Sequence, residues 1–271
     1  MKKVLLATTA LTLSAGFASA DVSISGSAEA GIHSTAGADH ITYSGLDMNF
    51  AVSGASDNGM SFSTTVDMGS GNIRDGFDPL ADDAQGTDFG APTITIGMEG
   101  FTVALGGNAA NDNLYDDDLA GGGISVSGSA GDATFAVVTG LADDEGTSAS
   151  LGYSVGAMGI SAAMTDVGDV ASFTVSYDMG DIGISVTSDD GDTSSEISYT
   201  AGALSTSIEA DDDSNWDVSI AYAAGAASVG FATDNDDAWE ATVGYDLGGG
   251  ASFNAGVNEG ETSYATVGFS F

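Results

Sequence analysis

Residues 216–245 read "WDVSIAYAAGAASVGFATDNDDAWEATVGY", and the pattern of this stretch decides the fold. Apolar side chains recur at every second position, so that Trp216, Val218, Ile220 and Tyr222 alternate with polar or small ones. A period of two is typical of a β-strand with one apolar and one polar face. A short neutral connection, "AAGAA", and an acidic one, "ATDNDDA", join successive strands. The stretch therefore predicts one repeat of an antiparallel hairpin meander.

Aromatic residues mark the same repeat over the second half of the chain. Five tyrosines spaced by 22 to 24 residues each precede a short neutral connection, and two tryptophans lie near the opposite ends of their strands. Tyrosine is common in strands generally, but a set in register on the apolar face favours an aromatic girdle at a membrane interface. The predicted girdle residues are Tyr153, Tyr177, Tyr199, Tyr222, Tyr245, Trp216 and Trp239.

The alternating runs predict an all-β fold, a transmembrane antiparallel up-and-down β-barrel of 16–18 strands. Counting the runs gives eighteen, with sixteen left open because short strands are easily miscounted. Tight periplasmic turns are expected at one rim and longer, acidic extracellular loops at the other. A soluble sandwich is the alternative, but no long return connection of a Greek key appears. A closed meander also pairs every backbone group, as lipid requires.

The first residues, "MKKVLLATTALTLSAGFASA", have the three parts of a secretory signal. Lys2 and Lys3 form a positive start, an apolar run follows, and Ala18-Ser19-Ala20 is a small-residue cleavage site. The apolar run is shorter than the roughly 20 residues of a spanning helix. We expect residues 1–20 to be a cleaved signal peptide and residues 21–271 to form a single barrel domain.

The charge balance is strongly acidic, with 40 Asp and Glu residues against 3 Lys and Arg. Beyond residue 20 the only basic side chain is Arg74. Such a chain should repel nucleic acid and attract cations, and without cysteine it has neither disulfides nor thiolate metal sites. By strand parity six acids should face the lumen: Glu29, Asp67, Glu196, Glu209, Asp217 and Glu240.

Catalytic patterns are weak. The two histidines, His33 and His40, have no partners at a recognisable spacing, so we expect no enzyme activity and no cofactor. Oxygen-rich acidic loops are suited to calcium or magnesium, yet "DDDSNWD" lacks the spacing of an EF-hand. Loop-bound Ca2+ or Mg2+ is therefore kept as an alternative, with its ligands unknown.

Two hairpins and the carboxy terminus resemble a known family. "SGASDNGMSFSTTV" near the start and "GYDLGGGASFNAGV" near the end are similar to hairpins of alpha-proteobacterial, Rhodobacter-type general diffusion porins of the Gram-negative outer membrane. The terminal Phe271, on an alternating strand, resembles the signal by which the outer-membrane assembly machinery recognises its clients. The resemblance covers most of residues 21–271.

The resemblance implies a homotrimer surrounded by outer-membrane lipid, with each barrel narrowed by a third extracellular loop folded into its lumen. By strand order that loop is 107–121, and it would place Asp112, Asp116, Asp117 and Asp118 at the constriction. The alternative is a solvated external loop. Family eyelets oppose such acids with arginines and lysines, whereas this chain offers only Arg74, in the second loop. In the family that loop tends to reach towards a neighbouring subunit.

Together these patterns predict a water-filled outer-membrane channel for passive diffusion of ions and small hydrophilic solutes, with strong cation selectivity. Rings of Asp and Glu are the usual device of cation-selective pores. The acids could instead mainly keep the surface hydrated at high salt. Two other classes stay open: a plugged or adhesive surface barrel whose acidic loops bind divalent cations, and a secreted acidic β-protein.

Overall fold

The computed structural model describes residues 20–77, 92–106, 123–141, 146–165 and 171–271. These residues form one 18-stranded antiparallel sheet. None of the described residues belongs to a helix long and apolar enough to cross a membrane. The strands are β1 (Asp21–Ser34), β2 (Ile41–Ala55), β3 (Ser61–Gly71), β4 (Thr93–Met98), β5 (Phe101–Gly106), β6 (Gly123–Ala130), β7 (Ala133–Gly140), β8 (Thr147–Val155), β9 (Met158–Thr165), β10 (Ala171–Asp178), β11 (Ile182–Asp189), β12 (Asp192–Ala201), β13 (Leu204–Asp211), β14 (Trp216–Ala224), β15 (Ala227–Asp234), β16 (Trp239–Gly248), β17 (Ala251–Asn258) and β18 (Ser263–Ser270).

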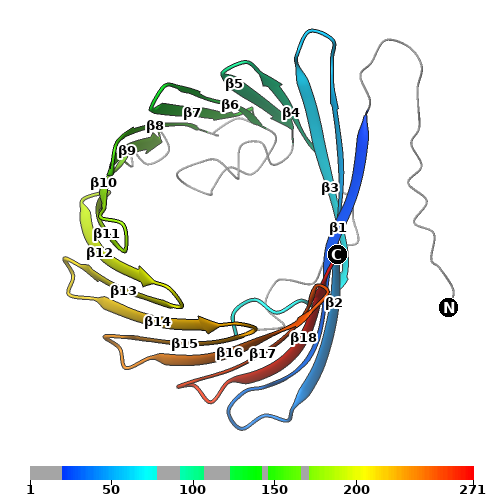
Figure 1. Ribbon diagram of the computed structural model, residues 1–271, viewed down its shortest axis with the longest axis vertical. Helices are drawn as coiled ribbons and strands as arrows, with labels where there is room; N and C mark the ends of the chain where they lie inside the picture. Colours follow the sequence, from blue (N-terminus) through cyan, green and yellow to red (C-terminus); the bar gives the residue numbers. More distant parts are fainter. Residues whose placement is uncertain (1–19, 78–91, 107–122, 142–145, 166–170) are drawn as a thin grey trace, which may run out of the picture.

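The sheet closes on itself. Each strand pairs with its neighbours in the chain, and β1 also pairs with β18, from Ser27 opposite Ser270 to Ser34 opposite Ser263. The result is a ring with no free edge (Figure 1). The predicted up-and-down barrel is confirmed at its upper count of eighteen strands, and the sandwich alternative is wrong.

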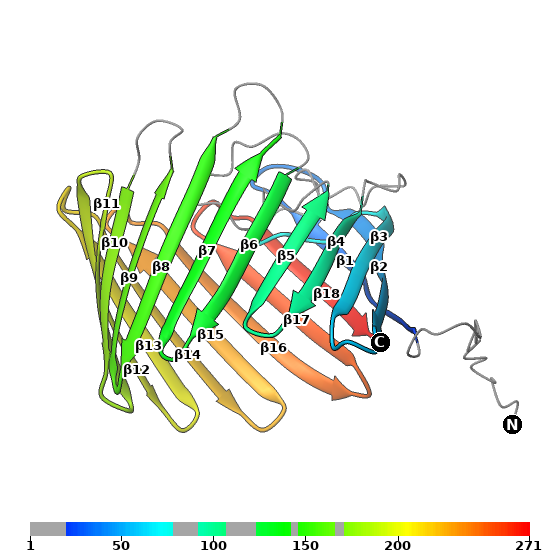
Figure 2. The ribbon, with the colours of Figure 1, turned by 90° about the horizontal axis from the view of Figure 1, so that it is seen from above.

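The two kinds of connection lie at opposite rims, as the sequence predicts. The short turns share one rim with the C-terminus (Figure 2), and all but the five-residue turn 56–60 have two or three residues. They are less uniformly neutral than expected, because Glu99, Asp132 and Asp181 lie in three of them. The expectation of longer acidic loops holds less well. Asp189 pairs with Asp192, so Asp190 and Gly191 alone make that acidic turn, with φ of 47° and 100°. Two successive residues with positive φ match the twist of a tight hairpin, which Asp-Gly favours.

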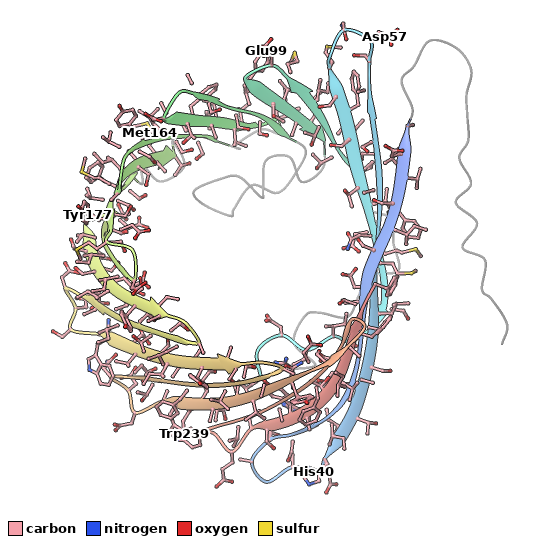
Figure 3. All side chains as sticks on the ribbon, in the orientation of Figure 1. His40, Asp57, Glu99, Met164, Tyr177 and Trp239 are labelled. Carbon is pink, nitrogen blue, oxygen red and sulfur yellow. The ribbon has the colours of Figure 1, made fainter. Side chains whose placement is uncertain are left out.

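The apolar side chains lie on the outside of the ring. Leu151, Met164 and Ile208 are 60%, 59% and 54% exposed, and Met164, Tyr177 and Trp239 point outward in Figure 3. A continuous apolar surface of this extent is unfavourable in water, at about 25 cal/mol for each Å². Hydrocarbon around the barrel removes that cost. The outer face is therefore suited to lipid.

Candidate pore lining

The inner face of the ring is hydrophilic. Because side chains alternate along a strand, Ser176 faces inward next to the outward Tyr177, and its cross-strand partner Ser185 shares that face. Hydroxyl groups bridge neighbouring strands on this face. Thr174 Oγ1 lies 3.0 Å from Thr187 Oγ1, and Ser207 Oγ lies 2.7 Å from Ser219 Oγ. Small hydroxyl side chains give a wall that water can wet.

A row of carboxylates continues directly from these serines. Ser185 lies opposite Glu196, Glu196 opposite Glu209, and Glu209 opposite Asp217. Asp217 in turn faces Asp234 on β15. We call Glu196, Glu209, Asp217 and Asp234 the acid row. Like charges directly opposite each other on a sheet repel, so this row needs hydration and mobile cations beside it.

The remaining predicted lumen acids occupy different surroundings. Glu240 follows the outward Trp239, lies on the inner face opposite Asn258 and is exposed. Asp67 is exposed opposite Asn49. Glu29 differs, because its side chain is only 13% exposed and accepts a 2.7 Å hydrogen bond from the Tyr43 hydroxyl.

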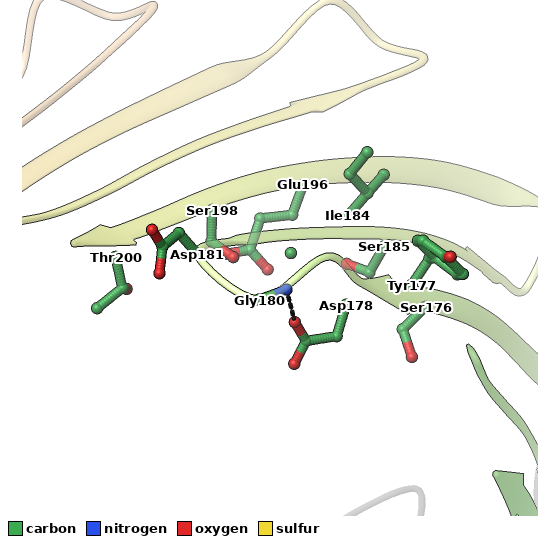
Figure 4. Close-up of a pocket in the computed structure, with 11 residues that line it drawn as sticks. Ser176, Tyr177, Asp178, Gly180, Asp181, Ile184, Ser185, Glu196, Ser198 and Thr200 are labelled. Carbon is green, nitrogen blue, oxygen red and sulfur yellow. Dashed lines mark hydrogen bonds between the residues drawn. The ribbon is translucent and has the colours of Figure 1, made fainter. Parts of the chain in front are cut away.

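The inner wall is hollowed at β10–β12, near the tight-turn rim. This open pocket, of about 420 Å³, is lined by carboxylates and hydroxyl groups (Figure 4). The Gly180 amide donates a 2.7 Å hydrogen bond to Asp178, which fixes the turn, while Asp181 and Glu196 lie beside Ser198. The pocket widens the wetted surface next to the acid row.

Arg74 lies on the inside of the barrel. The segment 72–77 follows β3 and lies within the ring, on the inner side of β16–β18 (Figure 1). Arg74 Nε is 3.8 Å from Glu29 Oε1, and its guanidinium carbon is 3.9 Å from the centre of the Tyr264 ring. The rest of this connection, 78–91, lies outside the described residues, so the expected reach of the second loop towards a neighbouring subunit stays a prediction.

The predicted girdle residues lie at two levels of the outer face. Each of the five tyrosines stands within three residues of the tight-turn end of its strand and is 39–50% exposed. Trp216 and Trp239 begin β14 and β16 at the acidic rim and are 41% and 38% exposed. Two aromatic levels on an apolar outer wall have the arrangement of interfacial belts.

The carboxy terminus completes the seam between the first and last strands. The Phe271 amide donates to the Gly26 carbonyl at 3.1 Å, and the Gly26 amide donates to the Phe271 carbonyl at 3.1 Å. The Phe271 ring stacks on Phe269 with centroids 6.0 Å apart. The predicted assembly signal is therefore also the last rung of the ladder that closes the ring.

The candidate constriction acids Asp112, Asp116, Asp117 and Asp118 lie outside the described residues. The wall next to the ends of that segment is described, however. A row of directly paired inward residues crosses β5–β9, and each is at most 8% exposed: Ala104, Ser125, Val138, Ser148 and Thr165.

The described part of the chain contains no preformed cluster of metal-ligating side chains. Within those ranges no three His, Asp or Glu side chains gather closely enough to hold an ion. The acid row is linear, with its carboxylates spread over four strands.

Several residues of the inner wall escaped the sequence prediction. Asp234 completes the acid row, and Tyr43 and Tyr264 pack around the Glu29–Arg74 pair. The alternation of side chains along the strand could have identified the two tyrosines. Tyr43 alternates with Gly45 and Asp47 on the polar row, and Tyr264 shares a row with Thr266 and Gly268. A tyrosine on the polar face of such a strand has to find a partner inside the ring.

A closed antiparallel ring with an apolar outer face and an inner face of hydroxyl and carboxylate groups is a transmembrane β-barrel of the channel-forming class. The family model of the Gram-negative porins matches residues 7–265. The chain therefore belongs to the Gram-negative porin family, and its place is the outer membrane.

Solved structures of similar fold include Rhodopseudomonas blastica porins. A Rh. blastica porin carrying five substitutions is 17% identical, with a TM-score of 0.58 and coverage of 93% of this chain and 100% of that one. A triple mutant of Rhodopseudomonas blastica porin is 18% identical, with a TM-score of 0.55 and the same coverage. At such identity the likeness shows the fold alone. No curated protein matches the chain.

The two tryptophans allow the belt to be tested without mutation. Trp216 and Trp239 are the only tryptophans in the chain. In vesicles we expect brominated lipids to quench their fluorescence most strongly when the bromine lies near the head group, because interfacial belts sit at that level. Quenching that is strongest with bromine at the middle of the bilayer would contradict the girdle.

Proposed function

We propose that the protein conducts ions and small hydrophilic solutes by passive diffusion and selects strongly for cations. The observation that carries the proposal is the acid row, four carboxylates side by side on the inner wall with no basic side chain among them. A pore lined by one sign of charge concentrates the opposite ion.

Single-channel recording in a planar bilayer under a KCl gradient tests the proposal. Stepwise conductance with a reversal potential on the cation side is the expected result. An unselective or anion-selective pore would refute cation selectivity. Folded protein that gives no conductance would favour the plugged or adhesive barrel instead.

We further propose that residues 107–121 fold into the lumen and that Asp112, Asp116, Asp117 and Asp118 line its narrowest part. The support is the buried row on the adjoining wall. Val138 and Ser148 are 1% and 3% exposed on the inner face, most of which meets water. Burial of such a row requires chain packed against it, and 107–121 joins the two strands at its edge.

Replacing the loop acids tests this placement. Asp116→Asn, Asp117→Asn and Asp118→Asn together should lower the K+/Cl− permeability ratio by roughly twofold for each charge removed in 0.1 M KCl. A unit charge about 10 Å from the ion path shifts the free energies of K+ and Cl− in opposite directions by about 0.4 kcal/mol each in water, and screening reduces that to less than half. Reversal potentials in dilute KCl measure it. A ratio equal to that of the unchanged protein would place the acids in a solvated external loop.

We also propose a homotrimer in outer-membrane lipid, and recognition of Phe271 by the assembly machinery. Both proposals follow the family resemblance. The support for the second is that Phe271 directly follows the last strand at the tight-turn rim and that its ring is exposed.

A further inference from the structure

The segment 72–77, here called the strap, leaves the barrel wall to cross the inner face of β2. β3 ends at Gly71, opposite Gly45, while β2 continues beyond that point to Ile41. The Asn72 amide then donates a 3.0 Å hydrogen bond to the Ser44 carbonyl. A Cβ on Gly45 would lie 2.4 Å from the Asn72 carbonyl oxygen, so this crossing requires glycine at position 45.

Arg74 fastens the strap to the seam between β1 and β18. Besides the 3.8 Å approach of Nε to Glu29, the Arg74 amide donates a 3.4 Å hydrogen bond to Glu29 Oε1. One face of the guanidinium covers the Tyr264 ring, and Nη1 donates to the Gly76 carbonyl. The Arg74 side chain is 17% exposed. Nε makes no hydrogen bond within the described residues, so the charge is held by its ion pair with Glu29 and by the aromatic ring, and only a small part of it meets the lumen.

The far end of the strap is also tied down. The Phe77 ring meets Tyr264 edge-to-face, with centroids 5.2 Å apart, and the Phe77 carbonyl lies 2.8 Å from His33 Nε2, which can donate to it. His33, Tyr43 and Tyr264 are 5%, 7% and 8% exposed although they face the inside of the ring. The strap covers them, and it therefore occupies part of the lumen cross-section.

We propose that Arg74 is a selectivity-determining residue whose role is to be withheld from the ion path. A free guanidinium on the wall would attract anions and oppose the acid row. Arg74 is balanced by Glu29 and stacked on Tyr264, and the other charged residue of the strap, Asp75, is an exposed carboxylate. The strap therefore narrows the pore at the seam without adding net positive charge. The contacts of Arg74 with Glu29 and Tyr264, here called the latch, fasten the strap to the seam. The charged side chains that remain free to meet ions in the lumen are then carboxylates. For its effect on selectivity the inference rests on the proposed cation-selective pore.

Chemical modification of arginine tests the latch directly, because Arg74 is the only arginine of the chain. Phenylglyoxal is small enough to enter a wetted barrel, and mass spectrometry of the folded protein follows its adduct. We expect slow modification of the unchanged protein. Glu29→Gln should speed it by about tenfold or more, since loss of a charge-assisted contact raises the free population by that order. Glu196→Gln, the same charge change on the far wall, should leave the rate unchanged.

Heat-modifiable mobility on gels confirms that each variant is folded before labelling. Tyr264→Phe keeps the ring and should stay slow, whereas Tyr264→Ala removes it and should be fast. Modification of the unchanged protein as fast as that of the denatured chain would overturn the latch. An unaltered rate in Glu29→Gln would do so as well.

Reversal potentials test the selectivity role. In 0.1 M KCl, Arg74→Met should raise the K+/Cl− permeability ratio by about twofold and Glu29→Gln should lower it by about as much. This is the screened effect of one unit charge about 10 Å from the ion path on a cation and an anion together. The double variant should return to the starting ratio. An unchanged ratio in Arg74→Met would refute the role of Arg74. An unselective parent channel would refute the proposed function instead, and the labelling result would stand apart from it.

Discussion

Neutralising the acid row should remove much of the cation selectivity. We expect Glu196→Gln, Glu209→Gln and Asp217→Asn together to lower the K+/Cl− permeability ratio roughly fivefold in 0.1 M KCl. Each carboxylate about 10 Å from the ion path contributes about 0.4 kcal/mol in water. Screening over a Debye length of about 10 Å reduces that to less than half. A carboxylate lowers the free energy of K+ in the pore and raises that of Cl− by the same amount. The effect of the three residues on the permeability ratio is therefore twice their effect on one ion. Reversal potentials across a KCl gradient provide the measurement.

The matched control removes three acids from the turns of the acidic rim. Asp190, Asp213 and Asp237 carry the same charge but lie in connections between strands. Asp190 and Asp237 have φ of 47° and 62°, a conformation that asparagine also tolerates. Their Asp→Asn variant should change the ratio much less than the acid-row variant. In 1 M KCl, where the Debye length is about 3 Å, the two variants should become alike. Equal losses in dilute salt would mean that the field comes from the rim.

The barrel itself was predictable because lipid outside and water inside impose a period of two on every strand. The alternation in 216–245 identifies strand, face and turn together, and the structure confirms eighteen strands. The same parity placed Glu196, Glu209 and Asp217 on one face. It could not show that they lie directly opposite one another, because pairing depends on register. Register here follows from the lengths of the connections, two residues at Asp190-Gly191 and four at 212–215, and these lengths are not evident from composition.

The inward strap was not predictable, because it follows from contacts distant in sequence. The contacts of Arg74 with Glu29 and Tyr264, and of the Phe77 carbonyl with His33, form only once β1 has paired with β18. Strand order correctly assigns Arg74 to the second connection, but order alone does not say whether a connection turns outward or inward. The one local indication of the inward turn was the pair Gly45 and Gly71, which lie opposite each other where the strap crosses β2.

Removing the aromatic ring at the end of the chain should affect assembly in the cell far more than stability. In Phe271→Ala the backbone can still exchange both 3.1 Å hydrogen bonds with Gly26, so the seam stays closed. What is lost is the exposed ring, 52% accessible on the outer face, and its stacking on Phe269. We expect purified Phe271→Ala to refold into detergent or lipid vesicles with nearly the yield of the unchanged protein. In cells its amount in the outer membrane should fall about tenfold or more, the order of effect expected from losing one central aromatic contact of about 1.4 kcal/mol or more in a recognition site.

Two comparisons separate recognition from closure. Phe269→Ala removes a ring two residues earlier on the same face and leaves the terminal aromatic in place, so its level in cells should stay close to normal. Deletion of Phe271 removes the ring and the last two hydrogen bonds together, and should lower the refolding yield in vitro as well. The heat-modifiable fraction on gels measures folding, and outer-membrane fractions measure assembly. If Phe271→Ala reaches the membrane at the normal level, the ring is not read during assembly, and the terminal residue serves only to close the barrel.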